Sequence, residues 1–173
     1  NNHNSGFSRA NNIAIKYSSG DYLFLLNNDT VVETDTIQKL YEFYIKLQDP
    51  SVIVPKLKNE DGSTQRPGSI LGQWRFLGNT PRKVPFVAGA ALFMSSRVYT
   101  EIGGLDEHLY FYNDDVDLCK TLSKKGYDII YYPLSELIHF GGLSTSTRKI
   151  GTIVEGYRGS FYICHKHYGC FFY

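Results

Sequence analysis

The residues of this sequence that could carry chemistry begin with an aspartate at the end of an apolar run. Asp29 follows the run at residues 21–26 and the polar pair Asn27 and Asn28. Such a run is typical of a strand buried in a parallel sheet, so Asn27 and Asp29 are expected at the carboxyl end of a strand. A carboxylate there is a candidate ligand for Mg²⁺ or Mn²⁺, which prefer oxygen atoms and often share their coordination shell with substrate phosphates. Asp29 could equally cap a turn.

A second candidate lies in the acidic segment Asp114, Asp115 and Asp117. On a helix, Asp115 continues the apolar stripe that follows it, whereas Asp114 and Asp117 share a different face. Asp115 is therefore expected to point toward the protein at the mouth of the sheet, where the helix dipole favours its ionised form. An ionised carboxylate can accept a proton from a hydroxyl group as a new C–O bond forms. The alternative is an acidic helix N-terminus that only stabilises the helix.

His139 is the third candidate. It follows an apolar strand segment and precedes Gly141 and Gly142, where the backbone can approach a ligand closely. A histidine at a strand end is also a common structural residue, so both interpretations stay open. The sequence contains no G-x-x-x-x-G-K-[ST], no G-x-G-x-x-G and no G-x-S-x-G motif. This excludes a P-loop, a dinucleotide-binding turn and a hydrolase nucleophile elbow.

Composition limits the class of protein. With 173 residues, of which 42% are hydrophobic, the chain is long enough to bury one core and to form one domain. The net charge of +1 gives no general attraction to nucleic acid. The longest apolar runs, such as residues 86–94, are too short to cross a bilayer, and no secretory leader opens the chain. We therefore expect a cytoplasmic protein, and peripheral association with the inner face of the membrane stays open.

Hydrophobic periodicity predicts the elements that position these residues. In the first half of the chain we expect a helix at residues 8–17, a buried strand at 21–26, a helix from 34 to about 49 and a strand from residue 52. Strand, helix and strand in this order form the unit of an open, mostly parallel α/β sheet flanked by helices. In such sheets, ligands collect at the carboxyl ends of the strands.

The second half of the chain continues the same alternation. Residues 59–83 are expected to form turns and loops with some short strands, and no chemistry is assigned to them. The remaining expected segments are a strand at 86–94, helices at 96–102 and 114–125, two strands at 127–132 and 136–140 broken by Pro133, and a helical segment at 150–168. The acidic group at residue 114 is therefore expected to open a helix, and His139 to lie near the end of a strand.

Five groups of short motifs resemble, in their order along the chain, the family 2 glycosyltransferases of the rhamnosyltransferase-like kind. They are N-S-G-F (4–7) with G-D-Y (20–22) and L-N-N-D-T (26–30), F-V-A-G-A-A (86–91), G-G-L-D-E (103–107) with F-Y-N-D-D-V-D-L-C (111–119), I-H-F-G-G-L-S (138–144), and H-K-H-Y-G (165–169). The resemblance spans nearly the whole chain. Each motif alone is weak, but five in the right order are specific.

The resemblance implies a GT-A fold, with a partial GT-A domain over residues 1–149 and a C-terminal helical segment at 150–173 packed on the same domain. It implies an inverting glycosyltransferase that moves a sugar from a nucleotide diphosphate sugar to a glycan or lipid-linked acceptor in polysaccharide biosynthesis. Rhamnosyl transfer is the chemistry that it favours.

The resemblance also implies roles for the candidate residues. By their positions in the motifs, Asn27 and Asp29 would contact the donor. Asp29, with His139 as a further ligand or diphosphate contact, would hold Mg²⁺ or Mn²⁺. Asp115 would be the catalytic base, with Asp114 beside it.

The chain departs from the family pattern at several positions. Asn28 replaces the usual proline, Ala14 stands where glycine is common, and Asp114 replaces glutamate. The family pattern also begins with a strand, a helix and a strand that bear a "V-D-N-x-S-x-D" nucleoside site, and nothing before Asn1 supplies it. The strand at residues 22–26 is therefore expected to have an unpaired edge, which strands of another polypeptide or of a swapped copy of this chain could cover. The alternative is that the fragment rearranges and loses donor binding.

Two other functions stay open at this stage. One is a noncatalytic fragment that keeps the acceptor side and serves as an interaction module. The other is a glycoside hydrolase, because these enzymes also use two carboxylates.

Overall fold

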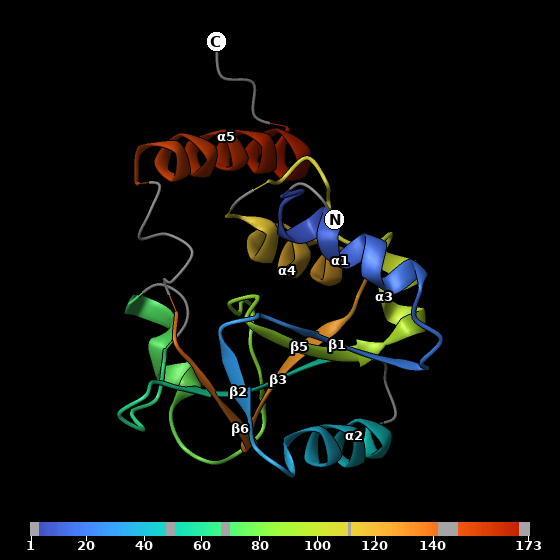
Figure 1. Ribbon diagram of the computed structural model, residues 1–173, viewed down its shortest axis with the longest axis vertical. Helices are drawn as coiled ribbons and strands as arrows, with labels where there is room; N and C mark the ends of the chain where they lie inside the picture. Colours follow the sequence, from blue (N-terminus) through green and yellow to red (C-terminus); the bar gives the residue numbers. More distant parts are fainter. Residues whose placement is uncertain (1–3, 48–50, 67–69, 111, 142–148, 170–173) are drawn as a thin grey trace.

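The computed structural model describes residues 4–47, 51–66, 70–110, 112–141 and 149–169 of the chain. Helices cover both faces of a twisted sheet: α2 lies on one face, α1, α3 and α4 lie on the other, and α5 lies beyond α4 (Figure 1). The elements in chain order are α1 (Phe7–Lys16), β1 (Tyr22–Leu26), β2 (Thr30–Val32), α2 (Thr36–Lys46), β3 (Ser51–Lys58), the 3₁₀ helix η1 (Ile70–Phe76), β4 (Arg82–Lys83), β5 (Ala91–Ser95), α3 (Ser96–Ile102), α4 (Asp114–Lys124), β6 (Asp128–His139) and α5 (Lys149–Tyr168). The predicted α/β class is confirmed.

The strand order of the sheet is β1-β5-β3-β6-β2, with β4 also paired to β6. Within the described residues, β3 and β6 are parallel, and every other pair of strands is antiparallel. The expectation of a mostly parallel sheet is therefore wrong. β1 and β3 do run in the same direction, but β5 lies between them, antiparallel to both. The chain reaches β5 through loops and η1, without the crossover helix that usually delivers a parallel neighbour.

Strand β6 is one continuous strand rather than the two that Pro133 was expected to separate. Proline has no N–H to donate to a ladder, so it is tolerated in a sheet mainly at edges and bulges. The register of β3 against β6 shifts between Pro55 and Lys56, which is such an irregularity. The shift accommodates the proline, and His139 therefore ends the same strand that begins at Asp128.

Strand β5 begins at Ala91, later than the expected start at residue 86. Residues 86–90 are irregular and contain a turn at Gly89 and Ala90. Because this stretch follows no ladder, its backbone is available to line a site at the end of β1.

The main core lies between the sheet and the helices α3 and α4. Met94, Val98 and Leu122 are among its members, and each has 0% exposure. On the other face, α2 covers the sheet with Leu40, which packs against buried residues of β3 and β5. Truncating Leu122 to alanine is expected to lower the free energy of unfolding by about 2–5 kcal/mol, as for other buried leucines. This core fixes the position of α4 on the sheet.

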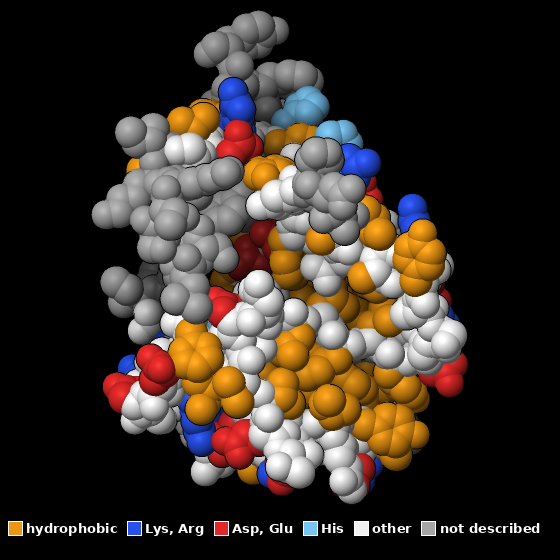
Figure 2. Space-filling view, in the orientation of Figure 1, with side chains coloured by type: hydrophobic (Ala, Val, Ile, Leu, Met, Phe, Trp, Pro, Cys, Tyr) orange, Lys and Arg blue, Asp and Glu red, His pale blue; other side chains and the backbone are white. Residues whose placement is uncertain are grey.

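Strand β1 is at one end of the sheet in the described part of the chain, as expected. Large apolar side chains are exposed nearby, including Tyr22 on β1 and Tyr41 and Ile45 on α2. Figure 2 shows hydrophobic side chains gathered over this part of the molecule. Self-association through this edge stays a prediction.

Helix α5 begins at Lys149 and ends at Tyr168, close to the helical segment expected over 150–168. Residues 170–173 lie outside the described part, and the division of the chain at residue 149 stays a prediction. Among the helices that the structure describes, none combines the length and the apolar character needed to cross a membrane.

Candidate active site

A tight turn at the end of β1 carries the first group of candidate residues. The Asn27 N–H donates to the Ala90 carbonyl at 2.9 Å, and the Thr30 hydroxyl donates to the Asn27 carbonyl at 2.7 Å. The N–H of Phe140, just after β6, donates to the Asp29 carbonyl at 2.9 Å. Backbone groups and one hydroxyl thus fix the turn between β5 and β6. They present the Asp29 side chain at the end of the sheet.

Asp29 and His139 lie next to each other at this end of the sheet. His139 Nε2 is 3.3 Å from Asp29 Oδ1, and the two side chains are only 15% and 11% exposed. Asp29 Oδ1 is buried and has no partner with hydrogen-bond geometry among the described residues. A buried carboxylate oxygen without a donor is costly unless a cation or another ligand reaches it. The pair is therefore suited to bind a cation.

Gln65 fixes the orientation of His139, a role that the sequence did not predict. The Gln65 Nε2 group donates to the His139 carbonyl at 2.6 Å, so Gln65 Oε1 is left as the acceptor 2.9 Å from His139 Nδ1. In the neutral imidazole, Nδ1 then carries the proton, and the Nε2 lone pair faces Asp29. Metal-binding histidines commonly donate their other ring N–H in this way.

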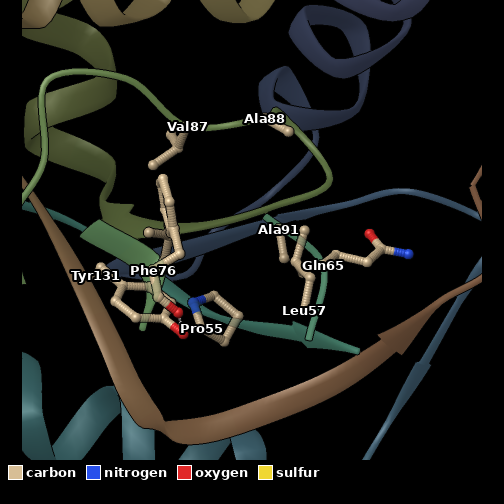
Figure 3. A pocket seen from close by; sticks show the side chains of 9 residues that line it. Pro55, Leu57, Gln65, Phe76, Val87, Ala88, Ala91 and Tyr131 are labelled. Atoms are coloured by element: carbon tan, nitrogen blue, oxygen red, sulfur yellow. Dashed lines mark hydrogen bonds between the residues drawn. The ribbon is translucent and has the colours of Figure 1, made fainter. Parts of the chain in front are cut away.

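Gln65 also borders a small internal cavity under the loop before β5. Figure 3 shows its amide extending away from Phe76 and Tyr131, which lie on the opposite side of this cavity. The cavity holds only about 10 Å³, roughly the room for one water molecule. It is too small for a substrate.

The second group of candidate residues lies at the start of α4. Tyr112 and Asn113 have φ angles of 63° and 66°, in the left-handed region. Asparagine tolerates this region, but a tyrosine is strained there by about 1–3 kcal/mol. This sharp turn opens α4 and directs its first side chains. Asp115 Oδ1 accepts a hydrogen bond from the Val116 N–H at 2.8 Å.

The environment of Asp115 is that of a base rather than of a simple helix cap. Burial, followed by the charge of Asp114, raises the pKa of Asp115 to about 6. Burial also raises the pKa of Asp114. A carboxylate that only stabilised the helix terminus would be expected to have a lowered pKa. At pH 7 Asp115 is mostly ionised, with a pKa close to the working pH that general-base catalysis favours.

Both groups line one cavity of about 570 Å³. Its lining includes all five candidate residues, which are Asn27, Asp29, Asp114, Asp115 and His139. The remaining wall comes from five residues between 4 and 11, from Leu26 and Asn28, from the loop at 88–90 and from Tyr110 and Tyr112. Figure 2 shows a hollow on this face with acidic side chains at its floor. A cavity of this size can hold a ligand as large as a cofactor.

Asp115 also borders a second, more open groove of about 430 Å³ between the start of α4 and α5. The other lining residues are Tyr112, Asn113, Ile153, Gly156, Tyr157 and Ser160. Because Asp115 belongs to both linings, a molecule in the groove could present a hydroxyl to it while another molecule occupies the main cavity.

Comparison with known proteins identifies the family. A model described as Glycosyl transferase family 2 matches residues 1–103, more than half of the chain. The chain belongs to glycosyltransferase family 2. The match includes Asn27 and Asp29, whereas α4, the whole of β6 and α5 lie beyond it. The resemblance predicted from the motifs is confirmed.

Several curated proteins are similar to this family 2 glycosyltransferase. The chain is 28% identical to the O-antigen biosynthesis protein RfbC of Myxococcus xanthus, over 88% of the chain and 13% of that protein. It is 27% identical to the N-acetylglucosaminyl-diphospho-decaprenol L-rhamnosyltransferase of Mycobacterium tuberculosis, over 51% of the chain and 29% of that protein. It is 23% identical to rhamnosyltransferase WbbL of Escherichia coli, over 78% of the chain and 61% of that protein. The chain thus spans less than two thirds of each of these relatives.

Solved structures establish the fold of this family 2 chain. GalNAc-T7, solved with UDP, GalNAc and Mn²⁺, superposes with a TM-score of 0.69 at 18% identity, over 93% of this chain and 35% of its own. The mannosyltransferase PcManGT of Pyrobaculum calidifontis, solved with GDP-Man and Mn²⁺, gives a TM-score of 0.59 at 12% identity, over 90% of this chain and 43% of its own. The predicted GT-A fold is confirmed.

The structure brings the predicted site residues together, but their chemical roles stay predictions. Gln65 was missed because it lies in the segment at 59–83, which was expected to be a loop without chemistry, and no sequence signal marks it. Asp117, in the same acidic segment as Asp115, is buried away from the cavity against Lys166 and His167.

Proposed function

We propose that this chain contains the reaction centre of an inverting glycosyltransferase that moves a sugar from a nucleotide diphosphate sugar to a saccharide acceptor. The observation that carries this proposal is that Asp29 and Asp115, far apart in the sequence, line the same cavity. Membership of glycosyltransferase family 2 supports transfer rather than hydrolysis.

The donor side of the site has ligands that fit Mg²⁺ or Mn²⁺. Asp29 offers a buried oxygen without a hydrogen-bond donor among the described residues, and His139 offers Nε2 beside it. The described residues contain no group of three or more His, Cys, Asp or Glu side chains that could hold the ion alone. The other coordination positions would be left to diphosphate and water, which is usual for these ions. When bound, the ion supplies Lewis-acid stabilisation of the charge on the leaving diphosphate.

The acceptor side of the site holds the base. Asp115 takes the proton of the acceptor hydroxyl while the hydroxyl oxygen attacks the anomeric carbon of the donor sugar. The bond between that carbon and the diphosphate oxygen breaks, and the diphosphate leaves with the electron pair. Attack opposite the leaving group inverts the anomeric configuration. Burial of Asp115 keeps its pKa raised, and the charge of Asp114 adds to this effect.

The groove between α4 and α5 is the place where the acceptor would bind. Tyr112 and Tyr157 give it aromatic surfaces, and Asn113 and Ser160 give it hydrogen-bonding groups beside Asp115. Such a mixture suits a sugar ring, which has both apolar faces and hydroxyl groups. Two relatives are named rhamnosyltransferases, and the name of one gives a diphospho-decaprenol acceptor. We therefore propose that this chain uses a rhamnosyl donor and a lipid-linked acceptor, which is presented at the cytoplasmic face of a membrane.

Titration calorimetry tests the proposed function. UDP, GDP, dTDP and their sugar conjugates are injected into the protein in the presence of MnCl₂, MgCl₂ or EDTA. We expect at least one nucleotide to bind with either metal and to lose its binding in EDTA. Absence of heat from every nucleotide in MnCl₂ would contradict the proposal and support a noncatalytic interaction module.

Replacing Gln65 by methionine is expected to weaken Mn²⁺ binding in the presence of the nucleotide by about 10- to 100-fold, the usual effect of losing a partner of a metal-binding histidine. Methionine keeps the side-chain length but removes both contacts with His139. Gln38→Met is the matched control, because Gln38 contacts only Glu42 on the exposed surface of α2 in the described structure. Electron paramagnetic resonance of free Mn²⁺ measures both affinities. Equal affinities in the two variants would show that Gln65 does not orient a ligand.

A further inference from the structure

The last turns of α5 carry a partly buried ionic cluster that the proposed chemistry does not use. Lys166 Nζ is 2.6 Å from Asp106 Oδ2 and 2.8 Å from Asp117 Oδ1. His167 Nε2 lies 2.7 Å from the same Asp117 oxygen. The Tyr162 hydroxyl donates to Asp106 Oδ2 at 2.8 Å. We call these five residues the α5 clamp.

The α5 clamp joins three segments of the chain. Asp106 belongs to the loop after α3, Asp117 to the first turn of α4, and the other members to the end of α5. The side chains of Asp117 and His167 are only 6% and 3% exposed. The buried carboxylate of Asp117 requires partners with good geometry, so its contacts with Lys166 and His167 hold α5 to α4 in one arrangement. None of the five residues lines the main cavity or the groove.

The middle of α5 contacts the strained turn that opens α4. Asn113 Nδ2 donates to the Gly156 carbonyl at 2.8 Å. Gly159 lies against the same side chain, since a Cβ added there would be 2.7 Å from Asn113 Nδ2. Left-handed backbone at Tyr112 and Asn113 persists only when its surroundings hold it. Helix α5 therefore stabilises this turn, which directly precedes the first residues of α4.

We propose that Lys166 and His167 are positioning residues, which lock α5 against α4 so that α5 holds the Tyr112–Asn113 turn and thereby aims Asp115 at the site. Asp117 lies two residues after Asp115, and Asn113 lies two residues before it. Helix α5 therefore contacts the chain on both sides of the base. A small misplacement of a catalytic group lowers a rate by as much as about a hundredfold. The effect on rate rests on the proposed function, whereas the effect on the backbone does not.

A pair of glycine substitutions in α5 tests this proposal. Gly159→Ala adds one methyl group, which forces the Asn113 amide away from Gly156. Gly151→Ala is the matched control, because the same methyl group in the same helix meets no atom within 4 Å. Both changes replace a helical glycine by alanine, which favours the helix at each position, so a loss seen only in Gly159→Ala reports the contact with Asn113.

Two measurements are made on the full chain of each variant. In Gly159→Ala we expect faster hydrogen exchange at residues 112–117 and unchanged exchange in β3 and β6, with kcat lowered about 10- to 100-fold at unchanged KM for the donor. Gly151→Ala is expected to match the wild type in both measurements. Exchange and kcat that do not differ between the two variants would overturn the proposal.

Substitutions in the α5 clamp give a second, independent test. Lys166→Met should increase exchange at residues 112–117 and lower kcat with unchanged donor KM, while Lys166→Arg, which can still bridge two carboxylates, should recover at least part of both losses. Loss of protection throughout the sheet in Lys166→Met, with no recovery in Lys166→Arg, would mean that the clamp only stabilises the fold. A wild type that binds no nucleotide would refute the proposed function, and the exchange data would still decide whether α5 holds the turn.

Discussion

The Asp115→Asn variant is expected to transfer sugar with a kcat lowered about 10²- to 10⁴-fold, because a general base usually contributes a factor of this size. Asparagine keeps the size of the side chain and an oxygen that can accept from the Val116 N–H, which Asp115 does at 2.8 Å. It cannot take a proton from the acceptor. Donor binding should be unchanged, because the predicted donor contacts belong to the turn at the end of β1 and not to the start of α4. Initial rates of nucleoside diphosphate release with saturating donor and acceptor measure the effect.

The pH dependence provides a second readout of the same variant. Because burial and the Asp114 charge raise the pKa of Asp115 to about 6, wild-type kcat/KM should fall about tenfold per unit as the pH drops below 6. The base must be ionised, so activity is retained above this pH. Asp61→Asn, a change in an exposed loop, is the control and should keep both the rate and the profile. A wild-type rate that is flat between pH 5 and 7, or a normal rate in Asp115→Asn, would exclude Asp115 as the base.

The same substitution should stabilise the fold at neutral pH. The pKa of Asp115 is about 6 in the folded protein against an ordinary value of 3.8. Because the folded value is the higher one, the carboxyl contributes stability that is fully present below about pH 4 and is lost as the pH rises through about 6. At pH 8 the ionised side chain therefore costs about 2–3 kcal/mol, which asparagine avoids. Thermal unfolding should show Asp115→Asn above the wild type at pH 8 and close to it at pH 4.

Replacing Asp29 by alanine is expected to lower nucleotide affinity in Mn²⁺ by about a hundredfold or more, because a metal that stabilises the diphosphate is worth several kcal/mol. Asp29 offers a buried oxygen that no described donor satisfies, and His139 alone is a weak site for these ions. The residual binding should no longer respond to EDTA. Calorimetry with and without EDTA measures both effects.

A matched control for Asp29 lies on the surface. Asp35→Ala removes a carboxylate that pairs with Lys39 at 2.7 Å and should leave nucleotide affinity unchanged. If Asp29→Ala binds the nucleotide as tightly as Asp35→Ala does and keeps its response to EDTA, the metal lies elsewhere.

Local patterns predicted the parts of the site that depend on one element. Asp29 was placed at a strand end because an apolar run precedes it, and Asp115 was placed on the inner face of a helix because it continues an apolar stripe. Both predictions need only the periods of strand and helix. His139 followed from the same argument at the end of β6.

The parts that depend on long-range partners could not be predicted. The antiparallel position of β5 between β1 and β3 follows from how a long irregular connection folds, and no periodic pattern records it. Gln65 acts only because the start of β2, the end of β6 and its own loop meet at His139. Asp117 was expected on another face from Asp115, but its burial against Lys166 depends on the docking of α5.

Anomalous diffraction at the manganese edge, from crystals grown with Mn²⁺ and a nucleoside diphosphate, tests the central claim most directly. We predict one manganese peak within about 2.3 Å of an Asp29 oxygen and of His139 Nε2, with the diphosphate in the cavity between this metal and Asp115. A manganese peak bound elsewhere, or a diphosphate outside the cavity that Asp29 and Asp115 share, would contradict the assignment of these two carboxylates to one sugar-transfer site.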